Sequence, residues 1–240
     1  MLREAASTAA QRPTVFLFDI DGTLISTGGA GRRSTERAFA RLHGRADACA
    51  SFAFGGMTDR AIFRKGLEAI GAEVDDATVD ALLAAYLDAL RDEMSRAVDF
   101  VIHAGVEAAI EAAAAHGRAA VGLGTGNVRE GARIKLDHAG LFARFAFGGF
   151  GCDHEDRAAL LRVGAERGAA QLGVAFDACR VVVIGDTPKD VAAARAIGAD
   201  SIAVATGGHA LDELVACGPT FAFRDLTDPD ARAALLGGAR

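Results

Sequence analysis

Short apolar runs that end in turn or polar residues recur along the chain. They show no regular alternation of apolar and polar positions, which is typical of strands buried on both faces of a parallel sheet. The predicted strands cover residues 14–18, 118–124, 145–150, 180–184 and 201–205, with 220–223 as a last edge strand. The first strand runs directly into an acidic sequence, Asp-Ile-Asp, at positions 19–21.

Helical patterns fill the intervals between the later strands. Apolar positions three and four residues apart predict helices over residues 105–116, 129–139, 156–172 and 191–197. Repeated strand–helix units produce a parallel sheet with helices on both faces. The predicted fold class is therefore α/β, with a Rossmann-like parallel sheet as its core.

The interval between the first strand and residue 98 has a different pattern. Three glycines among positions 28–31 mark the place where the chain leaves the core. Helices are predicted over 32–43, 58–70 and 76–96, and within this interval only 51–54 is strand-like. A small helical domain is therefore expected between the first strand and the rest of the sheet.

This change of pattern sets the expected domain boundaries. Residues 13–27 and 98–240 form the core, residues 28–97 form an inserted helical cap domain, and residues 1–12 form a flexible tail. The tail is short and mixed in composition, and it lacks the apolar segment of a signal peptide.

Composition narrows the class of protein. The chain has 240 residues, of which 51% are apolar and 24% charged, which fits a soluble globular protein with a sizeable core. A net charge of −6 gives no electrostatic case for binding nucleic acid or an anionic membrane. No apolar run approaches the roughly 20 residues that span a bilayer. Four cysteines without a C-x-x-C pair indicate reduced thiols and a cytoplasmic protein.

Acidic residues follow two of the predicted buried strands. Asp19 and Asp21 come after the first strand, and Asp186 and Asp190 come after residues 180–184. Open α/β sheets place their ligands at the carboxyl ends of strands, and Mg²⁺ prefers one or two carboxylates with water and phosphate oxygens. A calcium loop starting at Asp19 is excluded, because its sixth and twelfth positions would be leucine and alanine.

A threonine follows the strand over residues 118–124. The hydroxyl of Thr125 and the neighbouring backbone N–H groups can hold a phosphoryl oxygen, although a β-branched residue at a strand end also has a purely structural explanation. The adjacent glycines do not form a dinucleotide-binding fingerprint. The sixth position of that pattern is Asn127, and no acidic residue lies about 20 positions further on.

The sequence Asp-Ile-Asp-Gly-Thr at 19–23 resembles the first motif of the haloacid dehalogenase superfamily of phosphohydrolases. Thr125 and the pair Asp186 and Asp190 match its second and fourth motifs in the right order. The resemblance implies that Asp19 is the nucleophile and Asp21 the general acid/base. It also implies a Mg²⁺ site formed by Asp19, Asp21 (through its backbone carbonyl), Asp186 and Asp190, and substrate contacts from Thr23, Gly126 and Asn127.

The third motif of that superfamily is usually a lysine, and here the chain departs from the pattern. Its lysines are Lys65, Lys135 and Lys189, so none lies between 136 and 188. We expect Arg157, at the start of the helix before the second acidic loop, to take this role, with Lys135 as a helix-surface residue. The alternative is that Lys135 reaches the site from the preceding helix.

The inserted helical domain resembles the caps that close over such sites and select the leaving group. Residues 54–60 form a glycine-rich turn that leads into a cap helix and is expected to lie over the site. Arg60 is the expected contact for a substrate carboxylate. The alternative is that Thr58 caps the helix and Arg60 is a solvated surface residue.

Three functions are compatible with these residues. The leading hypothesis is a Mg²⁺-dependent phosphomonoesterase that resembles phosphoglycolate phosphatase and acts on a small phosphorylated metabolite through a phosphoaspartate. The second is a phosphosugar mutase, and the third a non-catalytic or receiver-like phosphate-binding protein. Asp21 argues against the dehalogenase branch of the superfamily, which lacks the second acid, and the cap and Asp21 argue against a receiver. The sequence leaves the oligomeric state open.

Overall fold

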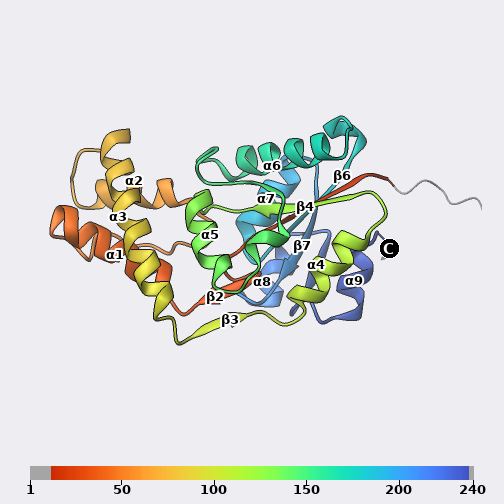
Figure 1. Ribbon diagram of the computed structural model, residues 1–240, viewed down its shortest axis with the longest axis horizontal. Coiled ribbons are helices and arrows are strands. Elements are labelled where there is room, and N and C mark those ends of the chain that lie inside the picture. The colour runs from red at the N-terminus through yellow and green to blue at the C-terminus, as the bar shows by residue number, and fades with distance from the viewer. Residues whose placement is uncertain (1–11, 238–240) are drawn as a thin grey trace, which may run out of the picture.

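A six-stranded parallel sheet lies at the centre of the computed structural model, which describes residues 12–237 (Figure 1). The strands follow the order β5-β4-β1-β6-β7-β8 across the sheet. Their bounds are β1 Thr14–Phe18, β4 Ala119–Gly124, β5 Phe147–Gly149, β6 Arg180–Gly185, β7 Asp200–Val204 and β8 Phe221–Phe223. This sheet confirms the α/β fold. The tail expected over residues 1–12 lies outside the described residues except for Arg12.

The central position of β1 follows from its composition. All five of its residues are buried, as an apolar strand with parallel neighbours on both sides requires. In the register, Phe18 lies opposite Leu123 of β4 and Ile184 of β6. The three strands therefore end at the same level, and the residues that follow them meet at one edge of the sheet.

Helices cover both faces of the sheet (Figure 1). Phe16 and Phe18 face a core that includes side chains of α4 (Val106–Ala115), α5 (Arg129–Asp137) and α9 (Pro229–Leu235). Val15 and Leu17 point to the other face, where they pack with α6 (Arg157–Gln171) and α7 (Pro188–Ala196). A shorter helix, α8 (Leu211–Ala216), packs beside β7 and β8. Two 3₁₀ turns cover Phe142–Arg144 and Phe176–Ala178.

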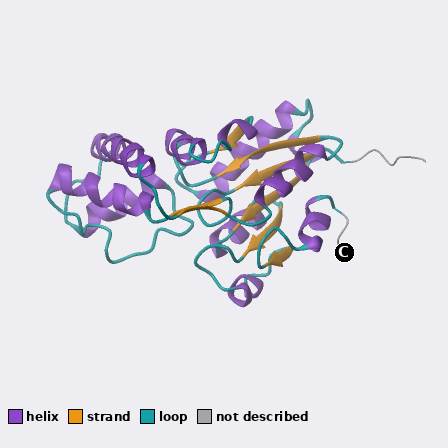
Figure 2. Cartoon of the chain, turned by 60° about the horizontal axis from the view of Figure 1, so that its bottom comes forward, coloured by secondary structure: helices purple, strands orange, loops and turns teal. Residues whose placement is uncertain are grey.

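Three helices form a second body at one end of the molecule (Figure 2). They are α1 (Ala30–His43), α2 (Asp59–Ala69) and α3 (Asp76–Ser95), and they enclose a core of their own. Its largest fully buried side chains are Phe39, Phe63, Leu67, Leu82, Tyr86 and Leu90. We call α1–α3 and the loops between them the helical unit. Residues 51–54 are a turn in this unit and not a strand, because Phe52 and Phe54 pack against its core.

A two-stranded antiparallel ribbon joins the helical unit to the sheet. It consists of β2 (Ile25–Thr27) and β3 (Phe100–Ile102), with Thr27 opposite Phe100. The ribbon was not predicted, because each strand has only three residues and its partner lies far away in the sequence. Its two strands carry the chain out of the core and back at one place.

Among the described helices, none combines the length and the apolar character that crossing a membrane requires.

Close packing of α6 against the sheet generates a test of the fold. An added Cβ on Gly149 of β5 would overlap the backbone of Leu160 in α6. We expect Gly149→Ala to push α6 away and lower the free energy of unfolding by about 1–3 kcal/mol. At about 2–4 °C per kcal/mol for a chain of this size, Tm should fall by several degrees in thermal unfolding.

Gly208→Ala is the matched control, because a Cβ on Gly208 meets no atom within 4 Å. This control should keep its Tm within about a degree, as expected of an exposed substitution. Equal unfolding temperatures for the two variants would contradict the packing described for α6.

Candidate active site

The polar residues that follow β1, β4 and β6 line one pocket of about 230 Å³. Asp19, Thr125 and Asp186 contribute from the edge of the sheet, and α1–α3 with the loop after α1 form the opposite wall. The register explains this convergence, since the backbone N–H of Asp19 donates to the carbonyl of Ile184 at 2.9 Å. Ligand sites at the carboxyl ends of parallel strands are general in open α/β sheets.

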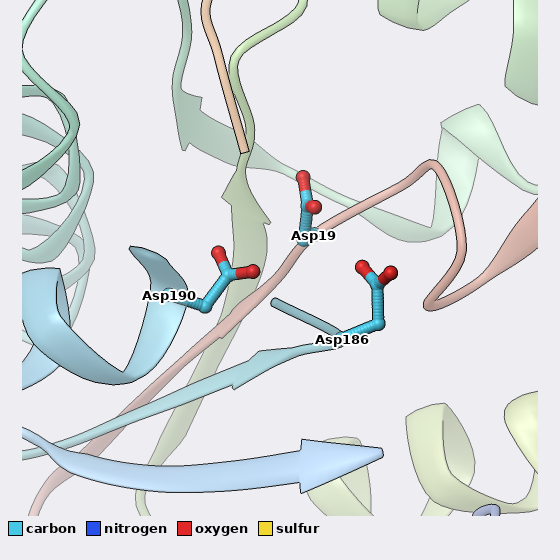
Figure 3. Close-up of side chains that lie close together, drawn as sticks. All are labelled: Asp19, Asp186 and Asp190. Atoms are coloured by element: carbon cyan, nitrogen blue, oxygen red, sulfur yellow. The ribbon is translucent and has the colours of Figure 1, made fainter. Parts of the chain in front are cut away.

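Three buried carboxylates form an acidic group in this pocket. One oxygen each of Asp19, Asp186 and Asp190 can be chosen so that all three lie within 4.8 Å of one another. Figure 3 shows the three carboxyl groups extending to the same side of the strand ends. One guanidinium, that of Arg157, lies against this group. When all are ionised, an excess of two negative charges remains, which is the charge of one divalent cation.

Burial and mutual closeness raise the pKa values of two of these carboxyl groups. Burial, together with the neighbouring carboxylates Asp19 and Asp190, raises the pKa of Asp186 to about 8. Burial also raises the pKa of Asp19 to about 6, although the Arg157 charge opposes the rise. Hard carboxylate oxygens at this spacing suit a hard divalent cation, which would neutralise their repulsion.

Local hydrogen bonds hold the acidic side chains in place. Thr23 donates from its hydroxyl to Asp186 Oδ1 at 3.1 Å, and Thr23 is itself buried and does not line the pocket. The expected substrate contact of Thr23 is therefore wrong, because its hydroxyl orients Asp186 instead. Gly22 has a φ of 83° and lies so close to Asp186 that a Cβ would overlap the carboxyl group.

Asp190 belongs to a helix cap as well as to the acidic group. Its Oδ2 accepts hydrogen bonds from the backbone N–H of Thr187 at 3.1 Å and from the Thr187 hydroxyl at 2.6 Å. The Thr187 hydroxyl in turn accepts from the backbone N–H of Asp190, which closes a capping box at the start of α7. This cap begins α7 at Pro188, three residues before the predicted start.

Arg157 reaches the acidic group from the first turn of α6. Its side chain is 8% exposed, Nη2 lies 3.0 Å from Asp19 Oδ2, and Nε donates to Asp190 Oδ1 at 2.7 Å. Burial lowers the pKa of Arg157, but Asp190 and Asp19 more than offset it, so the pKa lies above its usual range. Among residues 12–237, Nη2 finds no acceptor in hydrogen-bond geometry. Nη2 is nevertheless ion-paired with both Asp19 and Asp190, so the guanidinium lies between the two carboxylates.

Lys135 also reaches the site, which corrects the expectation of a helix-surface residue. It is 4% exposed, and its Nζ donates to both oxygens of Asp21, at 2.9 and 2.7 Å, and to Asn127 Oδ1 at 2.7 Å. Helical periodicity contains the signal that was missed. Lys135 is three residues after the buried Ala132 and next to the buried Leu136, so it lies on the inner face of α5.

Asp21 therefore points away from the acidic group. Its side chain is 45% exposed and is held by Lys135 and by Asn127, whose Nδ2 donates to Asp21 Oδ2 at 2.8 Å. Its carboxylate is not one of the metal-binding candidates among the described residues, and the expected metal contact of residue 21 through its backbone carbonyl stays a prediction. The two aspartates, one residue apart, thus have separate cationic partners.

The loop after β4 presents Thr125, Gly126 and Asn127 to the pocket. The Asn127 side chain donates to Thr125 Oγ1 at 2.9 Å as well as to Asp21, and its expected substrate contact stays a prediction. The Thr125 oxygen also accepts from the backbone N–H of Asn127 at 3.3 Å, which leaves its hydroxyl hydrogen available to an incoming oxygen. Gly126 lies against the backbone of Met57 in the helical unit.

The structure does not bring Arg60 to the pocket. Its guanidinium forms ion pairs with Asp76 and Asp80 at the start of α3, and Arg60 is not among the lining residues. The expected substrate contact is wrong because α2 turns this side chain toward α3. The helical unit lines the pocket with other side chains, which sequence reasoning missed: Arg32, Thr35, Phe54, Met57, Ile62 and Tyr86.

The helical unit is docked onto the core around this pocket. The buried Asp59 accepts a hydrogen bond through Oδ2 from the backbone N–H of Val128 at 2.8 Å, at the start of α5. Burial raises the pKa of Asp59 to about 6. Further contacts run from Arg64 Nε to Glu155 Oε1 at 2.8 Å and from Lys189 Nζ to the carbonyl of Gly55 at 3.0 Å. Together they enclose the pocket between the two bodies.

Comparison with known proteins identifies a family. A family model described as haloacid dehalogenase-like hydrolase matches residues 13–198, which include the helical unit and every residue of the acidic group. The chain has no significant match among curated proteins.

Solved structures with a similar fold cover almost the whole chain. A predicted phosphatase from Clostridium acetobutylicum is 19% identical with a TM-score of 0.68, and the match covers 95% of this chain and 100% of that one. CbbY from Rhodobacter sphaeroides in complex with phosphate is 16% identical (TM-score 0.67; 89% and 95% covered). A predicted phosphoglycolate phosphatase from Haemophilus somnus 129pt is 14% identical (TM-score 0.65; 92% and 97% covered). At these identities the similarity shows a shared fold.

The raised pKa values of Asp19 and Asp186 predict how metal-free protein responds to pH. Both groups bind protons more tightly in the folded than in the unfolded chain, so stability falls as pH rises from about 4 to above 8. In thermal unfolding with EDTA, Tm should decrease across this window. The gain in Tm on adding saturating Mg²⁺ should increase over the same window, because the cation replaces the protons.

Asp186→Asn is the control for this pH dependence, because it removes the group with the larger shift. The variant should show a flatter dependence of Tm on pH in EDTA and a smaller gain from Mg²⁺. A Mg²⁺ effect on the wild type that is the same at low and high pH would contradict a metal site formed by these carboxylates.

Proposed function

The chain belongs to the haloacid dehalogenase-like hydrolases, and on that premise we propose that it is a Mg²⁺-dependent phosphomonoesterase acting on a small phosphorylated metabolite. The observation that carries the proposal is the buried guanidinium of Arg157, whose Nη2 is ion-paired with Asp19 at 3.0 Å and with Asp190 but is aligned with neither in hydrogen-bond geometry. A phosphoryl group bound in front of Asp19 would place its oxygens beside this guanidinium, and the fork of an arginine suits two phosphate oxygens.

Asp19 is the nucleophile in this proposal. One of its oxygens attacks phosphorus and forms a phosphoaspartate while the bond to the leaving group breaks. Arg157 and the hydroxyl of Thr125 donate hydrogen bonds to the phosphoryl oxygens as negative charge shifts between them. Asp19, Asp186 and Asp190 would hold the divalent cation, which when bound screens the nucleophile from the phosphate charge.

Asp21 is the general acid/base. It lines the pocket, but its carboxylate is separated from the acidic group and held by Lys135. It gives a proton to the leaving oxygen and later takes one from the water that hydrolyses the phosphoaspartate. A group that must alternate between acid and base is best kept away from a metal ion, and this side chain meets that condition.

The helical unit acts as a cap that selects a small leaving group. A pocket of about 230 Å³ leaves room for a phosphoryl group and a few further atoms. Arg32 of α1 lines it and stacks on Phe54 at 4.0 Å. Its Nη1 and Nη2 donate to the carbonyls of Cys49 and Phe52 at 3.4 and 3.2 Å, and in the described chain no carboxylate lies closer to it than Glu36 at 4.0 Å. We assign to Arg32 the contact with an anionic leaving group that the sequence suggested for Arg60.

Four free cysteines fit the cytoplasmic setting of this proposal.

The assignment of Asp19 is tested by Asp19→Asn. The substitution removes the nucleophilic charge but keeps the size of the side chain, so release of inorganic phosphate from p-nitrophenyl phosphate should be abolished while the protein stays folded. EDTA should abolish the wild-type activity and Mg²⁺ should restore it. Retention of more than a few per cent of turnover by the variant would exclude Asp19 as the nucleophile, and product carrying the phosphoryl group on a sugar hydroxyl would indicate a mutase.

The role of Arg157 predicts a graded series of variants. Arg157→Ala should lower kcat by roughly 10²-fold, about 3 kcal/mol, because the transferred charge loses its donor. Arg157→Lys should recover part of the loss, since the charge returns without the fork. Steady-state phosphate release measures both, with Tm recorded to confirm folding.

Arg162→Ala is the matched control on the same helix, because Arg162 is exposed, pairs with Glu166 at 2.6 Å, stacks on the Phe176 ring at 3.8 Å and is not among the residues that line the pocket. Its activity should equal that of the wild type. Activity of Arg157→Ala at the level of Arg162→Ala would contradict the proposed phosphate contact.

A further inference from the structure

Lys135 is bound in a way that the proposed reaction does not explain. A lysine has three N–H donors, and here two reach Asp21 and one reaches Asn127. The amide nitrogen of Asn127 donates to the same Asp21 carboxylate at 2.8 Å. Asp21, Asn127 and Lys135 thus form a triangle in which each side chain is hydrogen-bonded to the other two. The Asp21 carboxylate therefore receives three hydrogen bonds from two side chains of the loop and helix that follow β4.

Stability alone is a poor explanation for this triangle. Burying an ammonium group to 4% exposure removes its hydration, and the ion pair recovers this cost only in part. Asp21 is 45% exposed and can be hydrated without any partner. What the triangle achieves is orientation, since a carboxylate held through both oxygens cannot rotate about its side-chain bonds.

The triangle of Asp21, Asn127 and Lys135 forms part of the pocket wall. All three residues line the pocket, and none of them belongs to the acidic group of Asp19, Asp186 and Asp190. Gly31 of the helical unit approaches Lys135, since a Cβ added to Gly31 would lie 3.5 Å from Nζ. The triangle thus lies where the core meets the helical unit.

We propose that Lys135 is a positioning residue that holds the Asp21 carboxylate in place as the base for hydrolysis of the phosphoaspartate. This inference rests on the proposed function. In the step concerned, a water oxygen bonds to phosphorus, the bond from phosphorus to Asp19 breaks, and the water proton passes to Asp21. The products are inorganic phosphate and the free Asp19 carboxylate, and the proton is later released to solvent.

Pre-steady-state kinetics separate this step from the first one. With p-nitrophenyl phosphate the leaving group departs without a proton, so formation of the phosphoaspartate needs little help from Asp21. Lys135→Met should form the intermediate normally and hydrolyse it slowly. The expected result is a burst of p-nitrophenol equivalent to the enzyme, a steady-state rate lower by about 10–10²-fold, and trapped phosphoenzyme after an acid quench.

Further variants test whether Lys135 acts through Asp21. Lys135→Arg should recover part of the steady-state rate, Asp21→Asn should show the same burst, and combining Asp21→Asn with Lys135→Met should be no slower than Asp21→Asn alone. Lys65→Met is the matched control, because Lys65 lies over the Phe52 ring on the cap surface, and its kinetics should be unchanged.

The outcomes distinguish a failure of the role assigned to Lys135 from a failure of the proposed function. A burst with Asp21→Asn but none with Lys135→Met overturns the role of Lys135 and leaves the proposed function intact. A raised KM with an unchanged ratio of burst to steady-state rate also overturns it, since Lys135 would then bind substrate directly. Absence of any phosphoenzyme in the wild type and in all variants contradicts the proposed function itself.

Discussion

Mutual repulsion among buried carboxylates is the constraint on which the site depends. The parallel register of β1 and β6 brings Asp19 and Asp186 to the same edge of the sheet, and the first turn of α7 adds Asp190. Burial strengthens the repulsion, which is visible in the raised pKa of Asp186. Arg157 supplies positive charge beside these groups, and the hydroxyls of Thr23 and Thr187 donate hydrogen bonds to them.

Each of the two aspartates that follow β1 has its own cationic partner. Arg157 lies against Asp19, and Lys135 lies against Asp21. The separation requires the chain to leave the extended conformation after β1 ends at Phe18, since residues two positions apart in a strand point to the same face. The same short sequence can therefore give the proposed nucleophile, Asp19, and the proposed acid/base, Asp21, different partners.

The helical unit completes the site by enclosing it. Asp59 accepts a hydrogen bond from the first turn of α5, so a residue of the cap satisfies a backbone donor of the core. The helix that begins after Val128 is the one that carries Lys135. Docking of the helical unit and placement of Asp21, the proposed acid/base, are thus linked through α5.

The sequence by itself determined the parallel sheet and the residues that meet at its edge. Apolar runs followed by Asp19, Thr125 and Asp186 suffice for this, because the carboxyl ends of parallel strands necessarily converge. Only the tertiary structure decided where the long side chains go: Lys135 inward, Arg60 toward α3, and Arg32 into the pocket. A long flexible side chain on a helix can reach several partners, so its direction depends on packing between elements far apart in the sequence.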